Sequence, residues 1–225
     1  MPLMTAAVMA RVAPFAVFIL LLALDPLVSS AMTGFGMDGR WSYAIRAALV
    51  AAMLAWWWRQ YSELSRPGSV PASTWILAML VGLLVFVVWI MPYPTWAMLG
   101  QGAGFDARGA NGDIDLPLAL VRLAGASLLV PVMEELFWRS FLMRWIDQSD
   151  FLSLKPMQVT LRALVMSSAL FAVEHTLWLA GLLAGLAYGA LYMISRQLWV
   201  PVLSHATTNA ALGLYVLHSG VWRYW

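Results

Sequence analysis

Long apolar runs with almost no charge dominate this sequence and limit what it can fold into. Of its 225 residues, 62% are hydrophobic and only 11% are charged, and the mean hydropathy is +0.78. A soluble globular domain carries roughly 25% charged residues, so this chain lacks the charge to cover an ordinary water-facing surface. The 13 tryptophans agree with this, because indole rings prefer the headgroup level of a bilayer. Lipid is therefore the expected solvent.

The composition also excludes several classes of function. The sequence has no cysteine, so disulfides and thiolate catalysis are excluded. The net charge of +2 is too small to indicate a nucleic-acid partner. We expect the lipid bilayer itself to be a partner, and we make no prediction of oligomeric state.

Apolar segments of roughly the length that a membrane-spanning helix needs, about 20 residues, recur along the chain. We therefore predict an all-α fold, a polytopic membrane helix bundle with about seven transmembrane helices in one integral membrane domain. Residues 1–116 would hold the N-terminal helices and a polar loop, and residues 117–217 the core with the candidate motifs. The predicted spans are residues 13–30, 43–58, 74–91, 117–146, 159–176, 179–195 and 198–217.

The first span also resembles a secretory signal, with Arg11 before the apolar run, and both interpretations stay open. Positively charged residues in short loops predict a cytoplasmic N-terminus. The inside set is Arg11, Arg59, Arg66, Arg144, Lys155, Arg162 and Arg196, and the outside set is Arg40, Arg46, Arg108 and Arg223.

Glycines mark two further features. Gly181, Gly185 and Gly189 are spaced four residues apart, which predicts a helix face that packs closely against a neighbour in lipid. The polar, Gly-rich connection at residues 91–117 is either a lid or a plain surface loop.

The segment "PVMEELFWRSF" places three charged side chains inside an apolar run. A carboxylate at the centre of a bilayer costs about 2.5–3.5 kcal/mol on insertion scales, and such groups usually mark functional sites. Glu135 and Arg139 are four residues apart, so they share a helix face and predict an ion pair. Glu134 points about 100° away and has no such partner.

Polar side chains on other apolar segments are candidate partners for Glu134. His175 lies in the fifth segment, and His205 and Asn209 lie four residues apart on one side of the seventh. If these groups converge, a carboxylate could take a proton from water while imidazole and amide donors hold an oxyanion. That arrangement would hydrolyse a peptide bond within the membrane.

Each of these residues also has a purely structural interpretation. A lone membrane histidine, an asparagine or an ion pair such as Glu135–Arg139 can simply hold helices together. Glu174 could orient its neighbour His175, replace it in a role or face the membrane interface.

Three motifs in this order resemble the CAAX protease and bacteriocin-processing family of intramembrane glutamic endopeptidases, which includes the type II CAAX prenyl endopeptidases. The motifs are Glu-Glu-x-x-x-Arg, Phe-x-x-x-His and His-x-x-x-Asn. They occur here as "EELFWR" at 134–139, "FAVEH" at 171–175 and "HATTN" at 205–209. The flanking sequences resemble the branch associated with bacterial exosortase systems, which implies a protein of the bacterial inner (cytoplasmic) membrane.

The resemblance implies a role for each matching residue. Glu134 would activate the attacking water with help from His175, and His205 and Asn209 would stabilise the oxyanion. Glu135 would belong to the catalytic set and support the site together with Arg139, and Phe171 would pack beside His175.

A membrane-anchored protein or peptide would be the substrate, and no cofactor is expected. A zinc-dependent protease would use Glu134, His175 and His205 as ligands, since zinc binds nitrogen and oxygen donors. The same residues also fit a non-catalytic membrane scaffold of the same fold or a small proton-coupled transporter.

Overall fold

The computed structural model describes residues 5–64, 70–100, 102 and 104–225. These residues form helices and no strand, apart from an isolated bridge between Arg108 and Ile114, which confirms the expected all-α bundle. The α-helices are α1 (Ala6–Ala23), α2 (Asp25–Gly34), α3 (Ser42–Trp56), α4 (Ala72–Ile90), α5 (Leu116–Ala124), α6 (Val130–Glu135), α7 (Met143–Asp147), α8 (Leu161–Val173), α9 (Trp178–Ser195) and α10 (Trp199–Ser219).

Short segments of other helix types complete the fold. Two π-helical segments, Gly125–Leu129 and Leu136–Leu142, join α5, α6 and α7 into one continuous helix, Leu116–Asp147. The 3-10 helices are Gly39–Trp41, Trp58–Gln60, Thr95–Ala97, Pro156–Gln158 and Trp222–Tyr224.

The described residues contain four helices that are long and apolar enough to cross a membrane. Together with the other apolar helices they make this an integral membrane protein, although the expected count of seven spans is not confirmed. The four are Ala6–Ala23, Ala72–Ile90, Leu116–Asp147 and Trp178–Ser195.

The first predicted span was wrong in its bounds. We expected one helix over residues 13–30, but α1 ends at Ala23 and a second helix, α2, begins at Asp25. Pro26 lies in the first turn of α2, where its missing N–H costs nothing, whereas inside one continuous helix it would remove a hydrogen bond. The sequence therefore breaks the helix at Leu24.

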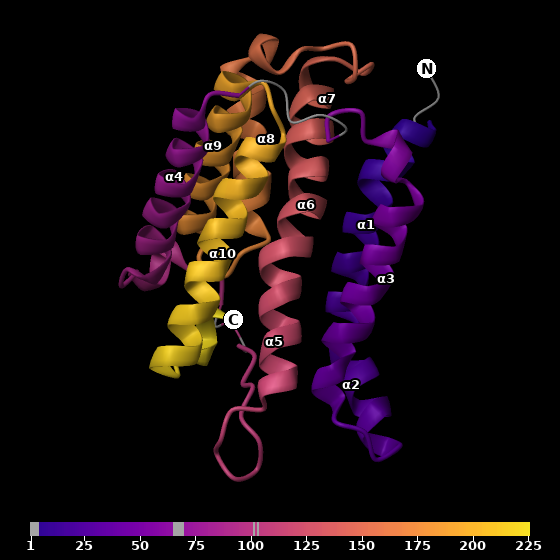
Figure 1. Ribbon diagram of the computed structural model, residues 1–225, viewed down its shortest axis with the longest axis vertical. Helices are drawn as coiled ribbons and strands as arrows, with labels where there is room; N and C mark the ends of the chain where they lie inside the picture. Colours follow the sequence, from indigo (N-terminus) through magenta and orange to yellow (C-terminus); the bar gives the residue numbers. More distant parts are fainter. Residues whose placement is uncertain (1–4, 65–69, 101, 103) are drawn as a thin grey trace.

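The helices form two groups on either side of the continuous helix α5–α7. Figure 1 shows α1, α2 and α3 on one side of it, and α4, α8, α9 and α10 on the other. The start of α1, the end of α3 and the connection after α7 lie at one end of the bundle (Figure 1). This places most of the predicted inside set at a common end, while Arg66 lies outside the described residues and the cytoplasmic orientation stays a prediction.

A buried ion pair joins the first group to the continuous helix. Arg11 in α1 is only 1% exposed; it donates to Glu63 through Nε at 2.7 Å and through Nη2 at 2.6 Å. Ser140, on the continuous helix, donates to the same carboxylate. Burial raises the pKa of Glu63, but the Arg11 and Ser140 contacts outweigh it and hold that pKa below its ordinary value. Arg11 therefore lies inside helix α1 and stabilises the fold through this ion pair. It does not lie in a loop, as the orientation argument assumed.

The glycine stripe of α9 packs against α8, as the four-residue spacing predicts. A Cβ added at Gly185 would lie 2.9 Å from Ser168 Cβ and 3.0 Å from its Cα. At Gly181 the added atom would lie 3.2 Å from the Cα of Ala172. These close approaches hold the α8–α9 pair, and therefore the turn between them, in place.

We expect Gly185→Ala to destabilise the protein by about 1–3 kcal/mol, because the new methyl group meets the Cα and Cβ of Ser168, which the α8 backbone holds in place. The matched control is Gly34→Ala: nothing lies within 4 Å of a Cβ added there, so this change is expected to be neutral or slightly stabilising. Thermal unfolding in detergent or nanodiscs measures both. Equal melting temperatures for the two variants would contradict the close-packing interpretation.

Candidate active site

Four polar residues singled out from the sequence line one cavity of about 220 Å³. Glu134 comes from α6, His175 from the turn between α8 and α9, and His205 and Asn209 from α10. Residues that are far apart along the chain therefore meet at one place inside the bundle.

Glu135 lies at the centre of a buried charge network. Its Oε1 accepts a hydrogen bond from Arg139 Nη1 at 3.1 Å and lies 3.0 Å from His205 Nδ1. Glu135 is 0% exposed and Arg139 is 2% exposed. Arg139 also donates to the carbonyl of Gly185 at 3.3 Å and lies over the ring of Phe171, 4.7 Å from its centroid. The predicted ion pair is confirmed, and it also reaches the histidine of α10.

Glu134, the residue before Glu135, is buried without a charged hydrogen-bond partner. Its residue is 8% exposed, and its Oε2 has no hydrogen-bond partner among the described residues. An unpaired carboxylate in an apolar bundle is costly. Glu134 faces the cavity, so water or a substrate group can satisfy it there.

His175 lies beyond the end of helix α8, although the sequence predicted it inside a helix. We expected a span over residues 159–176, but α8 ends at Val173 because the chain turns back into α9. The ring Nδ1 lies 2.8 Å from the carbonyl oxygen of Phe171. A carbonyl can only accept, so Nδ1 carries the hydrogen, and in the neutral ring Nε2 is left as an acceptor. The Phe171 ring also packs on His175, with centroids 4.6 Å apart.

His205 is held on both sides. Its Nδ1 contacts Glu135, and its ring stacks on Tyr188 with centroids 5.0 Å apart and planes 18° apart. The Tyr188 hydroxyl donates to Thr208 Oγ1 at 2.7 Å, and Thr208 in turn donates to the carbonyl of Gly82 on α4 at 2.8 Å. With Nδ1 donating to Glu135, Nε2 can donate into the cavity when the ring is an imidazolium.

The position of Asn209 follows from a proline on the neighbouring helix. In the π-helical segment Gly125–Leu129, the N–H of Val130 donates to the carbonyl of Gly125. The next such bond would run from residue 131 to Ala126, but Pro131 has no N–H. The free carbonyl of Ala126 instead accepts from Asn209 Nδ2 at 2.8 Å. An amide has two N–H donors, so one remains for the cavity.

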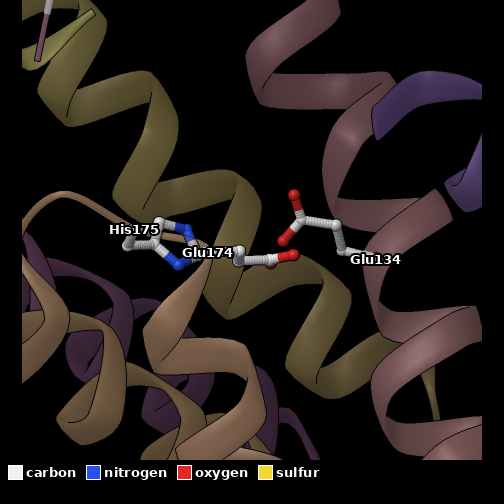
Figure 2. A group of neighbouring side chains, drawn as sticks. All are labelled: Glu134, Glu174 and His175. Atoms are coloured by element: carbon white, nitrogen blue, oxygen red, sulfur yellow. The ribbon is translucent and has the colours of Figure 1, made fainter. Parts of the chain in front are cut away.

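Glu174 lies close to Glu134 and His175. Single ligand atoms of Glu134, Glu174 and His175 all lie within 4.8 Å of one another, and Figure 2 shows the carboxylates of Glu134 and Glu174 pointing toward each other. Such a set can hold a metal ion. The set contains Glu174 in place of His205, which the zinc-dependent alternative would have used as a ligand; His205 is instead engaged by Glu135.

The Gly-rich connection contacts this turn. The N–H of Leu99 donates to the carbonyl of Thr176 at 2.7 Å, and Trp178 Nε1 donates to the carbonyl of Trp96 at 2.9 Å. The described part of the connection is therefore attached next to His175. Whether it opens as a lid stays a prediction.

Two residues of the site were not assigned a role from the sequence. Tyr188 stacks on His205. The sequence feature that could have pointed to it is a polar aromatic residue between Gly185 and Gly189, on the helix that carries the glycine packing face. Glu174 was left open between three interpretations, because sequence spacing does not tell in which direction a residue in a turn points.

Comparison with known proteins finds a family match in the C-terminal part of the chain. Residues 116–211 match the family described as Rce1-like: Type II CAAX prenyl endopeptidase Rce1-like. The matched range includes all the site residues named above from α6 to α10. No curated protein and no solved structure matches the chain.

Proposed function

We propose, from the premise that residues 116–211 form a domain of the Rce1-like protease family, that this chain is an intramembrane endopeptidase in which Glu134 activates water. The observation that supports this most is the buried Glu134 carboxylate, whose Oε2 is unpaired, in one cavity with His175, His205 and Asn209. Glu135 also has an unpaired Oε2, but its Oε1 contacts both Arg139 and His205, whereas no hydrogen bond joins Glu134 to a described residue and a structural carboxylate would be expected to have such a partner.

In the proposed reaction, Glu134 takes a proton from water while the water oxygen attacks the carbonyl carbon of the substrate peptide bond. His175 can orient the same water through Nε2, the ring nitrogen that is left as acceptor. The proton on Glu134 then passes to the leaving nitrogen as the C–N bond breaks. No covalent intermediate with the enzyme is required.

The negative charge on the substrate oxygen needs donors fixed in advance. Asn209 offers its remaining amide N–H, held by the bond to Ala126. His205 offers Nε2–H as an imidazolium whose counter-charge is Glu135 at 3.0 Å. Glu135 and Arg139 then position donors rather than touch substrate.

The substrate would be a membrane-anchored protein or peptide that reaches the cavity from the bilayer. A place in the bacterial inner membrane is implied by the resemblance to the exosortase-associated branch and stays a prediction.

A zinc-dependent version is the second candidate, and the cluster of Glu134, Glu174 and His175 favours it. One nitrogen and two carboxylate ligands are a suitable set for zinc, which would supply a polarised water. We prefer the metal-free reaction because Asn209 beside His205 forms an oxyanion site without further groups.

We expect Glu134→Gln to abolish cleavage, with a loss of at least about 100-fold, because the amide keeps the shape of the side chain and removes the base. Mass spectrometry of membrane-protein termini in cells with either the native protein or the variant would detect precursors that accumulate uncut. If the membrane-protein termini are identical in the two kinds of cells while the variant is folded and present at native levels, the result would contradict the protease proposal and favour a scaffold.

The metal question has its own test. In the metal-free reaction, EDTA leaves cleavage by the purified protein unchanged, and Glu174→Gln retains activity because Glu174 is not the base. A zinc enzyme would instead lose activity in EDTA and regain it with added zinc, and Glu174→Gln would lower both activity and bound zinc measured by mass spectrometry.

A further inference from the structure

A second cavity lies apart from the active site, between α4, the continuous helix and α10. It measures about 350 Å³, compared with about 220 Å³ at Glu134, and no motif residue lines it. Its lining side chains are apolar except for Ser127. Leu128, on one wall, is exposed, so this cavity is an open groove on the surface of the bundle.

Helix α10 turns different faces to the groove and to the active site. Val202, Leu203 and Ala206 lie three, four and seven residues after Trp199, which places all four on one face of the helix, and all four line the groove. His205 points instead into the active-site cavity. The groove is therefore separate from the catalytic cavity, and its occupant need not be a substrate.

The groove starts at the headgroup level of the bilayer. α4 and α10 lie side by side (Figure 1), with Trp75 in the first turn of α4 and Trp199 as the first residue of α10. Indole rings prefer the headgroup level. From Trp199 to Ala206 the helix rises roughly 10 Å, so the groove extends from that level into one leaflet. Water would find almost no polar partners there, which makes hydrocarbon the expected content.

The length of the groove favours one lipid chain over a helix of a partner protein. A partner helix is about 10–12 Å wide with its side chains and would run along the whole hydrocarbon core, about 30 Å thick. The groove ends near Ser127 and Ala206, after roughly a third of that thickness. A lipid chain that enters from the headgroup side can end there.

A cation without a partner lies at the headgroup end. Arg196 follows α9, three residues before Trp199, and is exposed. In the part of the chain that the structure describes, its guanidinium has no hydrogen bond or ion pair. Its φ is +60°, in the left-handed region that glycine adopts at lower cost. An arginine at such a position indicates that the side chain has a function.

We propose that the groove binds one anionic glycerophospholipid, with an acyl chain between α4, the continuous helix and α10 and the phosphate at Arg196. A guanidinium matches a phosphate in charge and in donor geometry. An anionic headgroup is favoured because a zwitterionic one brings its own cation beside Arg196. Trp199 Nε1 donates to the carbonyl of Leu64 at 3.0 Å, which fixes this wall of the groove before the lipid binds.

The test uses the full chain in phosphatidylcholine nanodiscs that contain a trace of a photoactivatable lipid. Two probes carry the same diazirine-bearing acyl chain: one is a phosphatidylglycerol, the other a phosphatidylcholine. After illumination, mass spectrometry locates the adducts and compares the groove with the exposed face of α4 at Leu80 and Leu84.

Three variants are compared with the native protein. Ala206→Leu fills the groove, and Arg196→Gln removes the cation. The matched control Ala52→Leu adds the same side chain to an exposed position of α3 that does not line the groove.

In the native protein and in Ala52→Leu, both probes should label the groove more than the exposed face of α4. The phosphatidylglycerol probe should label it about fivefold more than the phosphatidylcholine probe, the factor expected for one arginine at the membrane surface. Arg196→Gln should lower this ratio to about one. Ala206→Leu should lower labelling of the groove to the level of the exposed face, while labelling of that face stays unchanged.

Three results would overturn the inference. The first is labelling of the native groove no higher than that of the exposed face, as ordinary bilayer lipid or a covering partner helix would give. The second is a groove that Ala206→Leu labels as strongly as the native protein. The third is equal labelling by the two probes, or a ratio that Arg196→Gln leaves unchanged. Labelling needs no cleavage, so these outcomes are independent of the proposed protease function.

Discussion

The contact of Glu135 with both Arg139 and His205 is the interaction on which the rest of the site depends. It links the continuous helix to α10 through a fully buried carboxylate, and Arg139 extends it to α9 through Gly185. Removing one partner from such a buried pair typically costs about 3–5 kcal/mol. Because Glu135 satisfies these groups, the adjacent Glu134 is left to face the cavity. The two neighbouring carboxylates thus have different roles: Glu135 is structural, and Glu134 is proposed as the catalytic base.

Departures from regular α-helix build the cavity wall. The π-helical segment before Pro131 frees the Ala126 carbonyl, which fixes Asn209. π turns inside α-helices are frequent at functional sites. In this protein the π turn leaves a backbone carbonyl free to accept the hydrogen bond from Asn209. The close α8–α9 packing through glycines has a similar effect, since it holds the turn that carries His175 and Glu174.

Local spacing in the sequence predicted a good part of this arrangement. The four-residue separations gave the Glu135–Arg139 pair, the shared face of His205 and Asn209, and the glycine packing face. Other features depend on long-range packing that spacing does not contain. The end of α8 at Val173, the direction of Glu174 and the bond from Asn209 to Ala126 all follow from how helices meet and where π turns form. The break at Leu24 could have been predicted from Asp25–Pro26.

The most direct measurement compares melting temperature and cleavage for Glu134→Gln and Glu135→Gln side by side. Glu134→Gln should lose cleavage yet melt at or above the native temperature, because it removes an unpaired buried charge. Glu135→Gln should melt lower by about 10 °C, because it breaks a buried pair. A Glu134→Gln protein that still cleaves, or that melts as low as Glu135→Gln, would contradict the division of roles between the two carboxylates.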